Sequence, residues 1–399
     1  MIIGIIKEGK LPYDKRTPLT PTDAVLLQQK YPTIKVVAES SAHRCFSDAE
    51  YSSLGIEVVQ DIRIADVLLG VKEVPIKELH ANKTYLFFSH TIKKQEYNRD
   101  LLQAIIAGNI RLIDYECLVD EKENRIIGFG KFAGIVGAHH GLRTFLKRKN
   151  IRLPLAHEVK DYAALINSYT DYILPPLKIA VTGSGRVAKG SIDLLQKIGI
   201  TQVTKEEYLT ATATTPVFCQ LTSKDYYQHK DNKPFDNTYF HEFPQEYVST
   251  FLPYTKVTDI LMNGIFWKET IPKFFSLQDI KSSDFHIETI SDISCDIDGS
   301  IPCTIQETHI DDPIFTYHKY KDCITNWDDT DGIDIIAVSN MPCELPIDAS
   351  IEFSNALISK VLPEFLTENS ILLQKATIAS NGTLQQDYAY LTDYLKGLE

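Results

Sequence analysis

The sequence has few of the features that mark secreted, metal-binding or membrane proteins. Its seven cysteines are scattered over 399 residues without any C-x-x-C spacing, so we expect neither a disulfide framework nor a zinc site. No apolar run approaches the ~18 residues of a membrane span, and the apolar start MIIGII is too short for a secretory signal. These absences predict a cytoplasmic location and no membrane partner.

Positive charge is also scarce. Lys and Arg number 41 against 53 Asp and Glu, which gives a formal net charge of -12. Such a chain repels nucleic-acid backbones, so we expect no nucleic-acid partner, although a small anion can bind where a few Arg or Lys converge. Hydrophobic residues make up 44% and charged residues 24%, which is the composition of a globular protein. A chain of this length is expected to form two or three domains.

Short β-branched runs alternate with helical patterns in the first part of the chain. Strands are predicted at 1–7, 36–37, 56–59, 65–71, 84–88 and 111–114. Helices are predicted at 21–30, at 47–51 and at 98–107. The second of these helices opens with an S-x-x-E capping box. The alternation predicts an open parallel α/β sheet.

A second α/β block follows a Gly- and Ala-rich stretch at 128–141. We interpret this stretch as a loop that feeds a long helix, and we place the first domain boundary there. Later strands are predicted at 177–182, 201–203 and 333–338, and helices at 351–362 and 388–398. The region 221–258 is poorly periodic and is predicted to be an insertion with short helices.

A glycine loop lies between a predicted strand and a predicted helix at 177–199. Gly183, Gly185 and Ala188 fit G-x-G-x-x-A. The first glycine permits the tight turn, the second lets the backbone approach a pyrophosphate, and the alanine lets the helix pack closely on the strand. The alternative is a purely structural turn. The predicted cofactor-binding residues of this loop are Gly183, Ser184, Gly185, Arg186 and Val187.

The choice between NAD and NADP stays open. A carboxylate that binds the ribose is expected about 20 residues beyond the loop, at the end of the next strand, which we place at 201–203. Thr204 and Lys205 follow that strand and could accept a 2′-phosphate, whereas Glu206 would favour the free 2′-hydroxyl.

Several motifs resemble one enzyme family over nearly the whole chain. The segments KRTPLTP (15–21), GVKEVP (70–75), FFSHTIKKQ (87–95), DYECL (114–118) and NRIIGFGKFAG (124–134) resemble saccharopine dehydrogenases. The segments TDILMNGIFW (258–267), ISDISCDIDGSI (290–301) and ATIASNGTL (376–384) are similar to the lysine–2-oxoglutarate reductase part of bifunctional lysine-degrading enzymes. SNMPCELPIDAS (339–350) resembles alanine dehydrogenases, and the wider superfamily includes transhydrogenase subunit alpha.

The resemblance implies a fold of class α/β. Two Rossmann-like domains with parallel sheets would face each other across a cleft, with the second domain inserted in the first. The catalytic domain would comprise residues 1–132, completed by 344–399, and the dinucleotide-binding domain residues 133–343. The two α/β blocks inferred from the strand pattern agree with this division.

The resemblance also implies the reaction and its catalytic groups. An amine, a 2-oxo acid and a nicotinamide would interconvert lysine plus 2-oxoglutarate with saccharopine, through an imine and a hydride transfer. Lys72 matches the family's catalytic lysine, and His90 has a second acid–base role. Both follow predicted strands, as do Glu73 and Glu116, and open α/β sheets bind ligands at this end of their strands.

Further residues are expected to bind the substrates and the cofactor. The resemblance assigns substrate carboxylates to Arg16 and Arg125, because guanidinium grips a carboxylate with two hydrogen bonds. Lys93 and Gln95 are weaker candidates for orienting substrate, and Phe129 would pack on nicotinamide or substrate. The expected cofactor contacts outside the loop are Thr204, Lys205, Asp292, Ser339, Asn340 and Met341. Cys295 and Asp296 lie close to Asp292 in the sequence, but no metal-ligand spacing is present, so no metal is expected.

Two alternatives remain from the sequence alone. One is another opine or amino-acid dehydrogenase, alanine dehydrogenase included. The other is a nucleotide-binding subunit without catalysis, as in transhydrogenase alpha, although Lys72, His90 and Arg16 together argue against it. The expected partners are lysine, 2-oxoglutarate and saccharopine, with NAD or NADP as cofactor. We expect a monomer or a small homo-oligomer.

Overall fold

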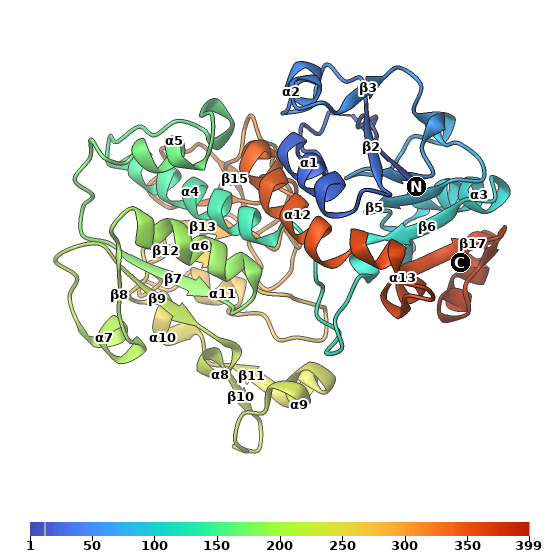
Figure 1. The fold of residues 1–399 in the computed structure, drawn as a ribbon. Coiled ribbons are helices and arrows are strands. Elements are labelled where there is room, and N and C mark those ends of the chain that lie inside the picture. Colours follow the sequence, from blue (N-terminus) through green and yellow to red (C-terminus); the bar gives the residue numbers. More distant parts are fainter. Residues whose placement is uncertain (12, 399) are drawn as a thin grey trace. The chain divides into compact units, whose positions relative to one another are not determined.

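The computed structural model describes residues 1–11 and 13–398 (Figure 1). They divide into two compact units. The first comprises Met1–Phe129 and Pro346–Glu399, and the second comprises Gly130–Leu345. Each unit is built on one eight-stranded sheet.

The sheet of the first unit is mostly parallel. Its strands are β1 (Ile2–Ile5), β2 (Lys35–Glu39), β3 (Glu57–Val59), β4 (Val67–Leu69), β5 (Thr84–Phe87), β6 (Arg111–Asp114), β17 (Thr377–Ser380) and β18 (Thr383–Leu384). They lie in the order β18-β17-β6-β5-β4-β1-β2-β3. The strands from β3 to β6 pair in parallel, whereas β17 and β18 add an antiparallel edge.

Helices bury both faces of this sheet. They are α1 (Pro21–Lys30), α2 (Asp48–Ser53), α3 (Arg99–Ala107), α12 (Pro346–Lys360), α13 (Ile371–Ala376) and α14 (Thr392–Leu395). Alternate strand residues point to opposite faces. Leu69 and Leu86 therefore lie in one apolar cluster with α1, α12 and α13, whereas Leu68 and Tyr85 lie in another with α3 and α14.

The second unit repeats this arrangement. Its strands are β7 (Lys178–Thr182), β8 (Thr201–Gln202), β9 (Val217–Leu221), β12 (Ile260–Asn263), β13 (Thr289–Asp292), β14 (Phe315–His318), β15 (Cys323–Thr325) and β16 (Gly332–Ile336), in the order β15-β14-β16-β13-β12-β7-β9-β8. The strands from β8 to β16 pair in parallel, and β14 and β15 form the antiparallel edge.

Two long helices pack together in the second unit, and an aromatic cluster fills the opposite side of its sheet. The two long helices are α4 (Gly130–Arg148) and α6 (Arg186–Lys197). The shorter helices of this unit are α5 (Tyr162–Asn167), α7 (Lys205–Thr210), α8 (Ser223–Tyr226), α9 (Asn237–Glu242), α10 (Leu252–Thr255) and α11 (Leu277–Ile280). The insertion at 221–258 forms short helices, as predicted. It also forms an antiparallel pair of β10 (Tyr227–His229) and β11 (Tyr247–Ser249), whose Tyr227 and Tyr247 pack with Phe240 of α9.

The expected loop at 128–141 is wrong, because helix α4 already begins at Gly130. Its glycines serve close packing instead. A Cβ on Gly134 would lie 1.9 Å from the carbonyl oxygen of Val187 on α6, and one on Gly190 would lie 1.9 Å from that of Lys131. The Ser191 hydroxyl donates to the Gly134 carbonyl at 3.0 Å across the same contact. The glycines therefore let two helix backbones touch, and helix packing outweighs the low helix propensity of glycine.

Candidate functional site

Polar side chains follow the carboxyl ends of four neighbouring strands in the first unit. Glu8 follows β1, Lys72 and Glu73 follow β4, His90 follows β5, and Glu116 follows β6. These four strands are adjacent in the parallel part of the sheet, so their carboxyl ends share one edge. Ligands of open α/β sheets bind at this edge.

Glu73 is the centre of this group. Its Oε1 lies 2.7 Å from Nδ1 of His90, and its Oε2 accepts a hydrogen bond from Lys10 Nζ at 2.7 Å. Burial alone would raise the Glu73 pKa, but the hydrogen bonds from His90 and Lys10 outweigh it and lower the pKa to about 2. Glu73 is therefore an anion near neutral pH, and His90 donates its Nδ1 proton to it. The neutral imidazole then carries its lone pair on Nε2.

The backbone of His90 is held in an uncommon conformation. Its φ is 54°, in the left-handed region that non-glycine residues seldom adopt. The preceding Ser89 is fixed by Asp114, which accepts from the Ser89 backbone N–H at 3.0 Å and from its hydroxyl. Burial raises the Asp114 pKa to about 6, although these hydrogen bonds oppose the shift. Such strain persists only where the surroundings enforce it and is common at functional sites.

Glu116 forms ion pairs with two of the predicted substrate-binding residues. Its Oε1 lies 2.9 Å from Arg125 NH2 and 3.4 Å from Lys93 Nζ. The Glu116 side chain is buried, and its Oε2 has no hydrogen-bond partner among the described residues. Gln95 is not part of this group, since its Oε1 accepts from the Tyr97 hydroxyl at 2.6 Å.

Sequence reasoning missed Glu8. Its Oε1 accepts from the backbone N–H of Val71 at 2.7 Å, and its Oε2 from that of Lys72 at 2.9 Å. Glu8 therefore holds the backbone from which the Lys72 side chain projects. The residue is half-buried, and burial of its carboxyl group raises the Glu8 pKa to about 8, with a further rise from the nearby Asp14. The signal was available, because Glu8 follows a predicted strand as Lys72 does.

Arg16 is enclosed in the loop that precedes α1. Its Nε and NH2 donate to the two oxygens of Asp14 at 3.0 and 2.6 Å, and both side chains are almost fully buried. The Arg16 Cζ lies 4.1 Å from the ring centroid of Phe129. Phe129 in turn stacks on Phe353 at 4.5 Å with an interplanar angle of 7°. The sequence did not indicate Asp14 or Phe353 as partners of this arginine.

The glycine loop of the second unit has the geometry of a dinucleotide site. Gly183 follows β7 with a φ of 100°, and a Cβ on it would lie 2.8 Å from the carbonyl oxygen of Gly264. Gly185 precedes α6, and apart from Gly185 and its two chain neighbours no described residue has an atom within 4 Å of the place where its Cβ would be. The first turn of α6 has no side-chain cap, so the N–H groups near Ser184, Arg186 and Val187 suit an anion. The residues present therefore fit a pyrophosphate.

The ribose contact is expected at the end of the strand that follows α6, which is β8. The structure places β9 beside β7, and β8 is the exposed edge strand. Thr204, which follows β8, caps α7 through a capping box with Glu207. Lys205 Nζ donates to Asp225 Oδ1 at 3.0 Å, and Asp225 lies in the short helix α8 that follows β9. Thr204 and Lys205 therefore do not follow the strand beside β7, although Lys205 contacts the helix after that strand.

Asp292 lies at the end of β13 and is fully buried. It accepts hydrogen bonds from Asn263 at 2.9 Å, Ser294 at 2.7 Å and Thr304 at 2.7 Å. Burial raises the Asp292 pKa. These hydrogen bonds hold the loop that begins after β13, at the same sheet edge as Gly183. Asp292 therefore contributes to the structure of that edge as a buried acceptor.

The remaining expected cofactor residues follow β16. Ser339 is exposed and Asn340 is half-buried, whereas Met341 is 1% exposed. Met341 begins the short 3-10 helix η8 (Met341–Glu344), and its sulfur would lie 3.1 Å from a Cβ on Gly137 of α4. The structure thus brings Ser339 and Asn340 to the sheet edge of Gly183 and packs Met341 against α4.

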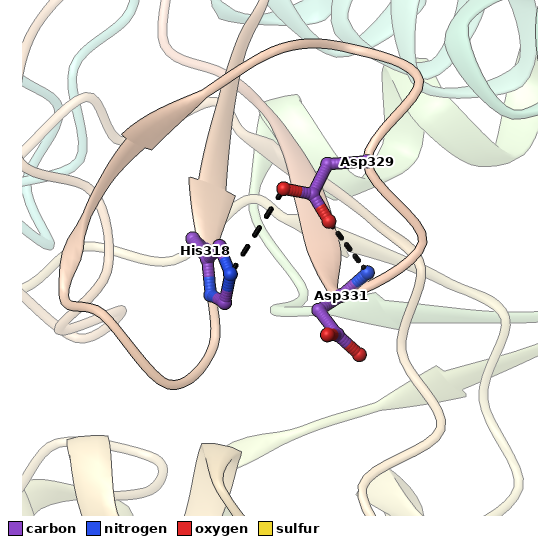
Figure 2. A group of neighbouring side chains, drawn as sticks. All are labelled: His318, Asp329 and Asp331. Atoms are coloured by element: carbon purple, nitrogen blue, oxygen red, sulfur yellow. Dashed lines mark hydrogen bonds and ion pairs between the residues drawn. The ribbon is translucent and has the colours of Figure 1, made fainter.

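One group of side chains has metal-ligand residue types, namely His318, Asp329 and Asp331 (Figure 2). Its hydrogen bonds do not suit a metal. His318 Nδ1 accepts from the Tyr320 backbone N–H at 3.1 Å, so the neutral ring carries its proton on Nε2, the nitrogen that faces Asp329. Metal-ligating histidines instead donate through the nitrogen that does not bind the metal. Asp329 accepts from the Thr325 hydroxyl, at the end of β15, at 2.7 Å and from the Asp331 N–H, in the loop before β16, at 3.0 Å.

No helix in the described part of the chain is long and apolar enough to cross a membrane.

Comparisons with known proteins agree with the resemblance seen in the sequence. Residues 4–136 match the family described as alanine dehydrogenase/PNT, N-terminal domain. The chain is 29% identical to the mitochondrial alpha-aminoadipic semialdehyde synthase of Mus musculus, over 98% of this chain and 47% of that protein. The chain thus spans about half the length of this relative. It is 26% identical to the saccharopine dehydrogenase (NAD(+), L-lysine-forming) of Schizosaccharomyces pombe, over 88% of this chain and 90% of that one.

A solved structure supports the fold. An L-alanine dehydrogenase matches 100% of both chains with a TM-score of 0.64 and 16% identity. The α/β class, with two Rossmann-like domains of mostly parallel sheet, is therefore confirmed. The expected similarity to saccharopine dehydrogenases is confirmed as well.

Proposed function

We propose that this chain, as a relative of the saccharopine dehydrogenases, is an NAD(P)-dependent oxidoreductase that interconverts saccharopine with L-lysine and 2-oxoglutarate. In the reductive direction lysine, 2-oxoglutarate, NAD(P)H and a proton would give saccharopine, NAD(P)+ and water. The observation that carries the proposal is the group of Lys72, Glu73, His90 and Glu116 at the carboxyl ends of adjacent strands, in a chain similar to saccharopine dehydrogenase over 88% of its length.

Proton transfer would be the work of Lys72 and His90. The ε-amine of the substrate must lose a proton before it attacks the 2-oxo group, and the resulting carbinolamine must gain one to release water as it becomes an imine. His90 suits this exchange at Nε2, because Glu73 fixes the proton on Nδ1. Glu8 supports Lys72 by holding the N–H groups of its loop.

Substrate charge would be balanced by the ion pairs at the same edge. Arg16 would bind a carboxylate of the 2-oxo acid, and Arg125 and Lys93 would bind another beside Glu116. The buried Oε2 of Glu116 suits an ammonium group of the amino-acid substrate, since a buried carboxylate oxygen favours a charged donor.

The second unit would hold NAD or NADP. Gly183, Ser184, Gly185, Arg186 and Val187 would surround the pyrophosphate, and Asn340 and Ser339 would lie along the same sheet edge. The bound dinucleotide supplies or accepts the hydride. Thr204 and Lys205 remain the residues to vary for the ribose end, because Lys205 contacts Asp225 in the helix that follows β9.

The test is to follow oxidation of NADH and of NADPH with 2-oxoglutarate and a panel of amines. We expect oxidation with lysine and much less with shorter amino acids or ammonia. Pyruvate with ammonia tests an alanine-type dehydrogenase. Binding of dinucleotide without oxidation in any mixture would contradict the proposal and favour a non-catalytic nucleotide-binding protein.

A further inference from the structure

One face of helix α12 lies against the loop that carries Arg16. Ser350, Phe353 and Ser354 are spaced i, i+3 and i+4, so they share this face. All three are within 1% of complete burial. A helix that only covered the sheet would present apolar side chains here, so the two serines indicate a polar contact.

The two serines accept hydrogen bonds from the loop backbone. Ser350 Oγ accepts from the Thr17 N–H at 2.9 Å, and Ser354 Oγ accepts from the Thr20 N–H at 3.1 Å. The Thr17 N–H belongs to the residue directly after Arg16, and the Thr20 N–H belongs to the residue that caps the start of α1. Ser359, later on the same helix, instead bonds to the carbonyl of Asn355 within its own helix at 2.6 Å. Ser350 and Ser354 thus fix the backbone between Arg16 and α1.

Phe353 supports the guanidinium through a second ring. Phe353 stacks on Phe129 at 4.5 Å, and the Phe129 centroid lies 4.1 Å from Arg16 Cζ. Asp14 holds the edge of the same guanidinium with two hydrogen bonds. The arginine is therefore restrained by its carboxylate partner, by a ring and by the backbone that follows it.

We propose that the Ser350, Phe353 and Ser354 face of α12 positions Arg16 to bind a carboxylate of the 2-oxo acid. The inference rests on the proposed function and deepens it, because it assigns positioning residues to carboxylate binding. The side chains of Ser350, Phe353 and Ser354 act on Arg16 and its loop, and they need not touch the substrate. A shift of ~1 Å in a binding group can lower activity ~10²-fold, so the restraint has functional weight.

The test compares Ser350→Ala/Ser354→Ala with Ser359→Ala, a serine of the same helix that bonds only within it. We expect the KM for 2-oxoglutarate to rise ~10-fold or more in the double variant, because two buried N–H groups lose their acceptors and the loop shifts. The KM values for the dinucleotide and for lysine should stay within ~2-fold, as should all constants of Ser359→Ala. Equal rises for every substrate, or none, would overturn the inference.

Phe353→Leu provides a second variant that keeps the site apolar. Leu357→Ala, one turn later and also buried, is its control for lost packing on the same helix. We expect only Phe353→Leu to raise the KM for 2-oxoglutarate. If both variants raise it alike, the effect is packing alone and the inference is wrong.

A measurement that needs no activity separates this inference from the proposed function. Phenylglyoxal modifies arginine, and peptide mass spectrometry reports its rate at Arg16. We expect faster modification of Arg16 in Ser350→Ala/Ser354→Ala and Phe353→Leu than in the parent or in Ser359→Ala. Faster labelling with no 2-oxo acid activity in any variant would reject the proposed function and keep the positioning role. Unchanged labelling in an active enzyme would do the reverse.

Discussion

At the scale of single residues, two hydrogen bonds keep Glu73 ionised although it is only 9% exposed. His90 and Lys10 lower its pKa from the ordinary 4.5 to about 2. A carboxyl group with a lowered pKa stabilises the fold above its unfolded pKa. That contribution is lost as the pH falls from 4.5 towards 2, so acid should loosen the His90 contact in this range.

We expect Lys72→Met and His90→Gln each to lower turnover by ~10²-fold or more, because each removes a proton-transfer group. Dinucleotide affinity should change little, since the glycine loop is in the other unit. Steady-state kinetics and a fluorescence titration measure the two quantities. Lys77→Met, an exposed lysine in the same connection, is the matched control and should keep normal turnover. Normal turnover in Lys72→Met would remove Lys72 from the mechanism.

Glu8 has the opposite shift, because its pKa is raised from 4.5 to about 8. The folded state prefers the protonated form, so the stability that this group supplies is full below pH 4.5 and is lost as the pH rises to 8. As the pH rises through this range, we expect the free energy of unfolding of Glu8→Gln to increase relative to that of the parent protein. The gain should be on the order of 1–2 kcal/mol, because the residue keeps partial solvent contact.

Denaturant unfolding of both proteins at pH 5 and pH 8 checks this expectation. Other groups titrate in this range, so the measured quantity is the difference between the two proteins. A difference that does not change with pH would show that Glu8 is ionised in the folded protein.

At the scale of elements, a methyl group should destabilise the fold at a glycine of α4 but not at a glycine of the glycine loop. We expect Gly134→Ala to lower the free energy of unfolding by about 3 kcal/mol or more, because its Cβ meets a backbone carbonyl of α6 that cannot move away. Gly185→Ala should leave stability within ~0.5 kcal/mol, since its Cβ enters open space. Thermal unfolding compares them, and equal losses would contradict the helix contact.

Gly185→Val separates folding from binding at the same position. Its branched side chain would occupy the space where the pyrophosphate approaches the backbone, so we expect dinucleotide binding to be lost in a folded protein. Titration of NADH and NADPH by fluorescence quenching, with circular dichroism as the folding check, measures this. Unchanged affinity would place the dinucleotide away from the loop.

Local signals predicted most elements, because they lie in short stretches of sequence. The capping box at Ser47 opens α2, and the β-branched run before Gly183 is β7. One error came from a neighbour that the sequence does not reveal. The glycines at 130–141 favour a loop unless α6 packs against them. The order β7-β9-β8 likewise could not be predicted, because it depends on which strand pairs with β7. The unit border at Phe129 precedes α4, and the border at Leu345 precedes α12.

The site shows the same division. Lys72, Glu73, His90 and Glu116 could be placed at one sheet edge, because each follows a strand of a parallel sheet. Glu8 could have been added in the same way, because it follows β1. The contacts of Lys10 with Glu73 and of Asp14 with Arg16 could not be foreseen, since they form only through folding of the loop after β1. Predicting that Lys93 and Arg125 share Glu116 would have required the path of the loop after β6.

At the scale of the whole molecule, the first unit needs both ends of the chain. Phe353, Leu357, Leu373 and Ala376 are fully or almost fully buried in its core, and β17 pairs with β6. We therefore expect a chain truncated after Leu345 to leave the first unit unfolded while the second unit folds. Hydrogen exchange measured by mass spectrometry should show rapid exchange over β1–β6 and continued protection over β7–β16. Protection of β1–β6 in the truncated chain would contradict this expectation.

The pairing of β17 with β6 also sets the order of events on the ribosome. More than two hundred residues are translated after β6 before β17 emerges, which at ~5–20 residues per second takes tens of seconds. Throughout that interval the first unit would stay unfolded, with its apolar strand segments exposed, and such segments pair with other strands. Synthesis of this protein should therefore depend on chaperones that bind exposed apolar segments, and slowing translation should increase its aggregation.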